Sequence, residues 1–166
     1  MDQRVIEYLE RVDAVGTRLL ALAHPLPGLS TADPDSGERW DALQVWGHIN
    51  EFVPYWIEQI GGVVDSYQGE PVLFGRTKAD EGRLAGIESG RTMDLDVHRH
   101  WLEVHLSDLR RFLSALGEGA FGSQGLHARL GPLTMEQMIE DYLVGHLEEH
   151  AEQLENISLG PSSKSG

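Results

Sequence analysis

Residues 134–157 read TMEQMIEDYLVGHLEEHAEQLENI, and this stretch decides the fold. Its apolar residues recur at intervals of three and four positions, which is typical of a helix that buries one face. Thr134 and Gln137 have the spacing of a capping box directly before this run. We therefore predict a helix over residues 134–157. Its apolar stripe consists of Met135, Ile139, Tyr142, Leu143, Leu147, Leu154 and Ile157.

Two histidines, His146 and His150, fall within this apolar stripe. Because they are one helical turn apart, their side chains lie one above the other on the same face. A buried polar group without a partner costs ~1–3 kcal/mol, and one shared metal ion would satisfy both imidazoles. A pair of hydrogen-bonded core histidines is the alternative to metal binding.

A third histidine, His48, lies at the edge of the apolar stripe of an earlier predicted helix. Catalytic zinc sites are usually built from three protein ligands and an exchangeable water. We predict that His48, His146 and His150 bind one divalent metal ion and leave a coordination position open. Zinc and nickel are the metals that we expect first, with iron, manganese or copper as alternatives.

Three further helices are predicted, over residues 2–22, 41–67 and 94–116. The second opens with a capping-box pattern at Asp41 and contains Pro54, which should kink the helix or remove one backbone hydrogen bond. Its apolar stripe consists of Ala42, Trp46, Ile49, Val53, Trp56 and Ile60. No segment has the convincing alternating pattern of a β-strand.

The connections between the helices are long. Residues 24–39 contain several prolines and glycines, and residues 68–93 are rich in glycine and charge, with a short helix predicted over 78–84. Four helices with apolar stripes predict an all-α fold, namely a four-helix bundle with long inter-helix loops. We expect a single domain over residues 1–159 and a disordered polar tail over residues 160–166.

The chain is acidic, with 27 Asp and Glu residues against 13 Lys and Arg residues and a net charge of −14. Nucleic acids and anionic membranes bind basic patches, so we expect neither as a partner. No stretch approaches the roughly 20 apolar residues of a membrane span. The absence of cysteine excludes disulfides and thiolate ligands and fits a reducing compartment. We expect a cytoplasmic protein that acts on a small molecule.

Three further residues near the predicted ligands are candidates for catalysis. Glu51 follows His48 by three positions and Glu149 follows His146 by three. Either carboxylate could orient an imidazole or accept a proton from metal-bound water, although a glutamate on an acidic helix is usually just solvated. Tyr142 lies one turn before His146 and could hydrogen-bond a substrate, although such a tyrosine is more often a core residue.

The other histidines carry a weaker signal. His98 and His105 share the apolar stripe of the helix over residues 94–116, so either could join the metal site. A position at the rim of the bundle is the favoured expectation for both. We predict that His100 is exposed and that His24 and His127 lie in loops.

Residues 40–49, WDALQVWGHI, resemble the second-helix motif of the DinB/YfiT-like metalloenzyme family, in which a tryptophan precedes the helix and a histidine follows two turns in. Residues 131–134, GPLT, and residues 142–154, YLVGHLEEHAEQL, resemble the last helix of that family with its H-x3-H pattern. The resemblance covers the whole chain in helix order. It implies a four-helix bundle that holds a divalent metal ion at one end of its core.

The same resemblance implies that His48, His146 and His150 are the metal ligands. Family members with an assigned activity include metal-dependent transferases that act on low-molecular-weight thiols such as bacillithiol or mycothiol, and a mycothiol-dependent maleylpyruvate isomerase. We therefore expect a transferase in which the metal lowers the pKa of a thiol cosubstrate. The alternatives are a metal-dependent hydrolase, a non-catalytic metal-binding stress-response protein, and a helical bundle without metal. A homodimer is also expected.

Overall fold

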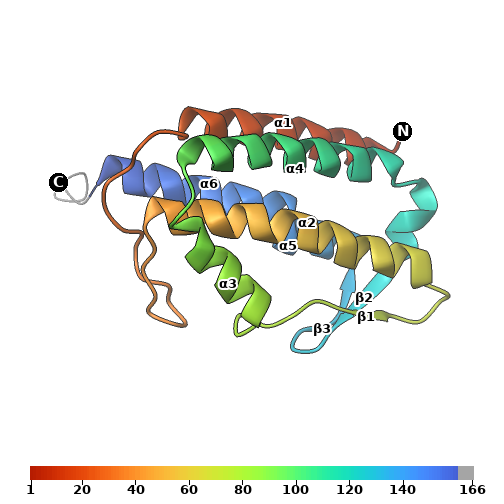
Figure 1. Ribbon diagram of the computed structural model, residues 1–166. Helices are drawn as coiled ribbons and strands as arrows, with labels where there is room; N and C mark the ends of the chain where they lie inside the picture. Colours follow the sequence, from red (N-terminus) through yellow and green to blue (C-terminus); the bar gives the residue numbers. More distant parts are fainter. Residues whose placement is uncertain (161–166) are drawn as a thin grey trace, which may run out of the picture.

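The computed structural model describes residues 1–160, and over these residues the chain is mostly helical, as predicted (Figure 1). The predicted disordered tail, apart from Gly160, lies outside the described residues. The helices are α1 (Gln3–Ala21), α2 (Ala42–Ser66), α3 (Glu81–Gly90), α4 (Leu95–Ala115), α5 (Met135–Tyr142) and α6 (Val144–Leu159), with a short 3-10 helix η1 (Glu118–Gly122).

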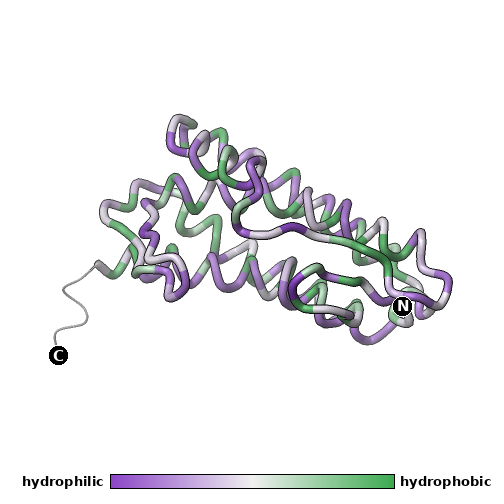
Figure 2. The backbone as a smooth tube through the Cα atoms, turned by 90° about the horizontal axis from the view of Figure 1, so that it is seen from below, coloured by the Kyte–Doolittle hydropathy of each residue, from purple (hydrophilic) through white to green (hydrophobic). Residues whose placement is uncertain are grey.

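The long helices lie side by side and enclose the core. Helix α4 packs against α1 and α2, and α6 packs against the same two helices, so each of these four helices has two of the others as neighbours (Figure 1). Hydrophilic and hydrophobic stretches follow one another along the helical parts of the chain (Figure 2). The apolar stripes therefore meet in the interior, which is the arrangement that amphipathic helices favour.

The core confirms the apolar stripe predicted for α2. All six of its residues are buried, namely Ala42, Trp46, Ile49, Val53, Trp56 and Ile60. Asp41 caps the helix in a capping box with Gln44, also as predicted. Pro54 lies on the exposed side, and α2 continues through it. Because proline has no N–H, the helix lacks the backbone hydrogen bond from residue 54 to the carbonyl of Asn50.

A small sheet packs beside the helices, and the expectation of no strand was wrong. Strands β1 (Val72–Phe74), β2 (Gln124–His127) and β3 (Gly131–Thr134) lie in the order β1-β2-β3. Strands β1 and β2 are parallel, and β2 and β3 form an antiparallel hairpin. Strands of three or four residues are too short to show an alternating pattern. Their pairing ties the connection after α2 to the segment before α5.

The helix predicted over residues 78–84 lies instead at Glu81–Gly90, where Asp80 caps its first turn. This helix, α3, packs tightly on α2. A Cβ atom added to Gly47 would lie 2.6 Å from the carbonyl oxygen of Gly86 and 2.8 Å from the Cα atom of Gly90. Since no real side chain fits at such distances, glycine is required where the two backbones meet. The contact fixes α3 beside the N-terminal part of α2.

The single helix predicted over residues 134–157 is divided at Leu143, whose φ of −121° and ψ of −88° are not helical. Gly145 follows the break, and a Cβ atom there would lie 2.2 Å from the carbonyl oxygen of Glu140. Arg11 of α1 spans the break, because its guanidinium binds Glu140 of α5 and Glu148 of α6. The break therefore sets the direction in which α6 leaves α5.

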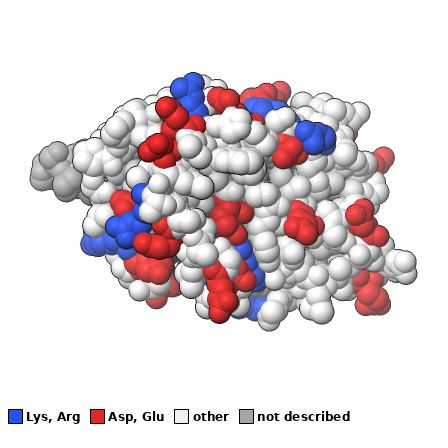
Figure 3. Space-filling view, viewed as in Figure 1, with Lys and Arg blue, Asp and Glu red and all other residues white. Residues whose placement is uncertain are grey.

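Charged side chains of both signs are interspersed on the face seen in Figure 3. Many of the basic groups form ion pairs with acids close to them in space, such as Arg18 with Glu155 and Arg110 with Asp13. Within the described part of the chain, none of the helices has the length and apolar character needed to cross a membrane.

Candidate metal centre

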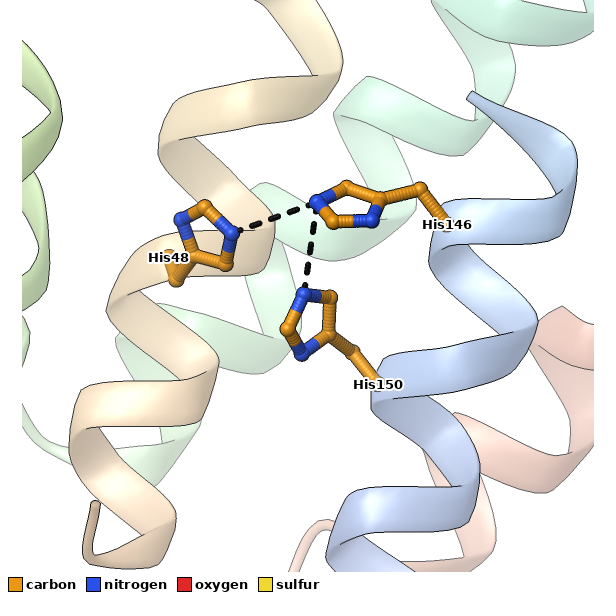
Figure 4. Close-up of side chains that lie close together, drawn as sticks. All are labelled: His48, His146 and His150. Carbon is orange, nitrogen blue, oxygen red and sulfur yellow. Dashed lines mark hydrogen bonds between the residues drawn. The ribbon is translucent and has the colours of Figure 1, made fainter. Parts of the chain in front are cut away.

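The three histidines predicted as ligands converge in the structure. His48 comes from α2, and His146 and His150 come from α6, with their rings pointing toward one another (Figure 4). The Nε2 atom of His146 lies 3.3 Å from the Nε2 atom of His48 and 3.3 Å from that of His150. One ligand atom of each residue lies within 4.8 Å of the other two, so the cluster could hold a metal ion.

Hydrogen bonding alone does not satisfy this arrangement. A neutral imidazole nitrogen carries either one proton or one lone pair, so Nε2 of His146 forms one good hydrogen bond and not two. The two 3.3 Å separations also match a metal site. Two nitrogens bound about 2.0–2.1 Å from a tetrahedral zinc ion lie roughly 3.3 Å apart. The donor set and its spacing therefore fit a divalent cation.

The Nδ1 atoms of the two α6 histidines, which point away from the cluster, have hydrogen-bond partners that orient the rings. Nδ1 of His150 lies 2.8 Å from Oε1 of Gln153, and Nδ1 of His146 lies 3.4 Å from Oε2 of Glu149. Both partners are acceptors, so each Nδ1 is assigned as the proton-bearing nitrogen. The lone pair of each Nε2 is then directed at the centre of the cluster, which is the arrangement that metal-binding histidines use.

His48 is held by packing instead. Its side chain is buried, with 3% of its surface exposed, and its Nδ1 atom has no hydrogen-bond partner among residues 1–160. The ring centroids of Trp40 and Phe52 lie 5.2 Å and 5.0 Å from that of His48. These two aromatic rings fix the orientation of the imidazole, and in this orientation its Nε2 atom faces His146.

Burial keeps two of the three histidines neutral. It lowers the pKa of His48 well below its ordinary value, and the nearby His150 and His146 lower it further. Burial, followed by the influence of His146, lowers the pKa of His150 to about 3. Metal ligation requires the neutral imidazole, so these two rings are ready to bind at neutral pH.

Two cavities open onto the histidine cluster. The larger has a volume of about 390 Å³ and the smaller about 140 Å³, and both are lined by His48, His146, Lys78 and Arg83. Trp40 and the loop over residues 31–38 also line the larger cavity. Trp56, Arg76, Asp141 and Tyr142 are among the other residues that line the smaller one. A small molecule could therefore reach the cluster from two sides.

The three weaker catalytic candidates have different positions. Glu149 lines the larger cavity, and its hydrogen bond with His146 lowers its pKa, so it is a carboxylate at neutral pH. Tyr142 lines the smaller cavity, where burial raises its pKa and keeps its hydroxyl protonated. Glu51 lines neither cavity, because its carboxylate binds Arg76 through contacts of 2.6 and 2.5 Å.

His98 and His105 do not join the cluster. His98 is 1% exposed, so the expectation that it lies at the rim was wrong. Its Nε2 atom lies 2.8 Å from the carbonyl oxygen of Gly90 and donates to it, which links α4 to the end of α3. His105 is partly exposed and stacks beside Trp101 at a ring-centroid distance of 5.7 Å. His98 therefore links two helices, whereas His105 lies at the partly exposed edge of α4, in line with the rim position expected for it.

The remaining histidines also lie away from the cluster. His24 lies exposed in a loop and His100 is exposed on α4, both as predicted. The loop position expected for His127 was wrong, because it is buried at the end of β2. Its Nε2 atom lies 3.3 Å from the carbonyl oxygen of Arg76. This contact joins the strand to the segment between β1 and α3.

Three residues of the site carried little or no signal in the sequence. Gln153 follows His150 by three positions, and the same spacing that drew attention to Glu149 could have identified it. Trp40 stacks on His150 at a ring-centroid distance of 6.1 Å, but the sequence indicated only its place before a helix. Arg83 lies far from every ligand in sequence and reaches the cavities only through the packing of α3 on α2.

Comparisons of this chain with protein-family models, curated proteins and solved structures found no match.

Proposed function

We propose that this chain is a metal-dependent transferase that activates a low-molecular-weight thiol at the centre formed by His48, His146 and His150. We further propose that its long helices form a four-helix bundle of the DinB/YfiT-like type. The sequence resemblance supports both parts, since the histidine and tryptophan positions that carry it lie together around one cluster. The bacillithiol and mycothiol type of cosubstrate belongs to this proposal.

The observation that supports the proposal most is that a substrate can reach the histidine cluster through cavities. One nitrogen of each of the three imidazoles lies close to the other two, the larger cavity is lined by all three histidines, and the smaller one is lined by His48 and His146. A structural metal site is closed by a fourth protein ligand, whereas a catalytic one keeps a position for water or substrate. The open cavities therefore favour catalysis over a purely structural or storage role.

The side chains around the cluster suit the handling of a thiol. A divalent metal, when bound, supplies a Lewis acid that lowers the pKa of a thiol. Glu149 lines the larger cavity as a carboxylate and can accept the proton that the thiol loses. The sulfur then forms a bond to a carbon of the electrophile, whose bond to its leaving group breaks with the electron pair. The protonated hydroxyl of Tyr142 lines the smaller cavity and can hydrogen-bond a group of a bound substrate.

The ligand set favours zinc or nickel as the metal. Imidazole nitrogen suits both ions, and iron and manganese are the alternatives. The Nε2 atom of His146 lies 3.3 Å from the Nε2 atoms of His48 and His150, which is the spacing of a tetrahedral site that zinc adopts readily. Zinc is therefore the ion with which we would reconstitute the protein first.

Elemental analysis of the untagged protein tests the metal centre. We expect near-stoichiometric metal in the wild type and in His100→Ala, whose histidine is exposed and lies outside the cluster. His48→Ala and His146→Ala should lose the metal while keeping the helical circular dichroism spectrum. A wild type that stays metal-free after reconstitution with zinc and with nickel would contradict the proposal.

Turnover is tested separately with the metal-loaded protein. We expect an electrophile to be consumed only when a low-molecular-weight thiol is present, and the consumption to stop in His146→Ala. A loaded protein that consumes the electrophile without any thiol would be a hydrolase. A loaded protein with no turnover at all would be a non-catalytic metal-binding protein.

Two expectations about partners stay predictions. Sedimentation velocity at several protein concentrations tests the homodimer expected from the family resemblance. The net charge of −14 leads us to expect no binding to nucleic acid, and a gel-shift assay at low salt is the direct test.

A further inference from the structure

Basic side chains are scarce in this chain, yet three of them adjoin the histidine cluster. Two of the three are already neutralised. Arg76 binds the carboxylate of Glu51 through both of its terminal nitrogens. Lys78 lies 3.5 Å from Asp33 and 3.3 Å from Asp35. The charges of Arg76 and Lys78 are therefore balanced within the protein.

The third basic residue, Arg83, has no such partner. Among residues 1–160 it makes no ion pair with any carboxylate, and its side-chain hydrogen bond runs from Nη1 to the carbonyl oxygen of Lys78, at 2.8 Å. Its guanidinium carbon lies 5.7 Å from the ring centroid of Trp40. The backbone N–H of Arg83 donates to Asp80 at 2.9 Å. These contacts hold the side chain at the cavities and leave most of its N–H donors without a protein acceptor.

The charge of Arg83 acts on the cluster. It contributes, after larger causes, to the lowered pKa of both His48 and His150. Burial lowers the pKa of Arg83 itself, as expected for a cation that has lost part of its hydration. Glu38, Glu51 and Asp33 raise the pKa of Arg83 without reversing the effect of burial. The three predicted ligands are imidazoles, so they would bring no negative charge to a bound dication. An anion beside Arg83 would reduce the repulsion between the guanidinium and a bound dication, and it would accept hydrogen bonds from the guanidinium N–H groups.

The smaller cavity is the place where an anion fits. Arg76, Lys78 and Arg83 line it together with a single acid, Asp141. The larger cavity is lined by four acids, namely Asp33, Glu38, Glu149 and Glu152. With a volume of about 140 Å³, the smaller cavity has room for a short arm of a thiol that ends in a carboxylate.

We propose that Arg83 binds a carboxylate of the thiol whose sulfur docks at the three-histidine centre, so that this protein selects anionic thiols over neutral ones. This inference rests on the proposed function and narrows its substrate class. A guanidinium presents paired N–H donors in a plane that matches the two oxygens of a carboxylate. Arg83 is thus a specificity-determining residue.

Thiol binding to the cobalt(II)-loaded protein tests this inference without any turnover, because a sulfur ligand adds a charge-transfer band to the cobalt spectrum. The probes are 3-mercaptopropionate and its neutral amide, 3-mercaptopropionamide. We expect the wild type to bind the carboxylate probe at least about ten-fold more tightly, as a hydrogen-bonded charge pair allows. Arg83→Gln should remove this preference and leave the affinity for the amide unchanged.

Two more variants sharpen the result. Arg83→Lys keeps the positive charge but loses the planar pair of N–H donors, so part of the preference for the carboxylate probe should remain. Arg110→Gln makes the same change in net charge at a residue that pairs with Asp13 on α1, and should keep the full preference. Cobalt content and circular dichroism confirm that each variant is folded and loaded.

The outcomes separate this inference from the proposed function. Equal affinity of the wild type for both probes, or an undiminished preference in the Arg83→Gln and Arg83→Lys variants, would overturn the role of Arg83 and leave thiol binding intact. A stoichiometrically loaded wild type whose spectrum responds to neither probe would instead refute thiol activation, and the inference would fall with it.

Discussion

The backbones of Gly47 on α2 and Gly90 on α3 touch, and a Cβ atom added to Gly90 would lie 2.5 Å from the Cα atom of Gly47. His48 is the next residue after Gly47, and Arg83 lies on the same short helix as Gly90. The contact therefore sets the distance between a predicted metal ligand and the cation beside it.

Replacing Gly47 with alanine should separate the two helices. The new methyl group would meet the carbonyl oxygen of Gly86 at 2.6 Å, and we expect a loss of about 1–3 kcal/mol in the free energy of unfolding. Urea denaturation measures the loss. Gly62→Ala on the same helix is the control, because its Cβ atom would have no neighbour within 4 Å. That variant should be neutral or more stable by up to about 1 kcal/mol. Equal effects of the two substitutions would contradict the close contact.

Gly145→Ala should damage the metal centre through the backbone. A Cβ atom there would lie 2.2 Å from the carbonyl oxygen of Glu140, so the break between α5 and α6 must shift. Since His146 is the next residue, we expect zinc affinity to fall at least about ten-fold, a loss of about 1.4 kcal/mol. Competition with a chromophoric chelator measures the affinity. An unchanged affinity would show that the break does not position His146.

The stability of the metal-free protein should fall as the pH drops from 7.5 to 5. The pKa of His48 and that of His150 are both lowered in the folded state, the latter to about 3, from an ordinary value of 6.5. Below pH 6.5 the unfolded chain therefore binds protons that the folded chain does not. The stability is fully present above pH 6.5 and is lost progressively below it, by about 2–4 kcal/mol in total at pH 5.

Thermal unfolding in the presence of a chelator, followed across this pH range, measures the effect. Most carboxylates titrate near pH 4, below the range used. His150→Gln should lose a substantial part of the pH dependence, whereas His100→Gln, which alters an exposed ring, should keep it. A melting temperature that stays flat from pH 7.5 to 5 would show that the two histidines are not held neutral.

Glu149→Gln should slow the proposed transfer without removing the metal. The amide can still accept a hydrogen bond from His146 but cannot take the thiol proton, so we expect a decrease of about 10²-fold in thiol-dependent turnover. Glu152→Gln is the control, because Glu152 lines the same cavity without contacting a predicted ligand. If the two variants retain the same activity, Glu149 is not the proton acceptor.

The helices and the histidine cluster were predictable because their signals are local and repeated. The stripe of α2 recurs over six residues, all of them buried, and the four-residue spacing of His146 and His150 alone places them on one face. Capping boxes at Asp41 and Thr134 also mark helix starts where the structure has them.

Other features depend on contacts between distant segments and left no local pattern. Strand β1 exists because it pairs with β2, about fifty residues later, and three residues cannot show a period. The break at Leu143 depends on the close approach of Gly145 to a carbonyl group, and an isolated glycine does not reveal that approach. Arg83 reaches the cavities only because α3 packs on α2.

His48 and His146 are 98 positions apart, and this separation has a consequence for the life of the protein in the cell. An unfolded chain cannot hold such distant ligands together, so a metal ion that needs all three histidines binds the folded chain alone. At a free metal concentration of 1,000 times Kd, such binding adds about 4.1 kcal/mol to stability. Proteases cleave the transiently opened chain, so the half-life of this protein should lengthen and shorten with the metal supply.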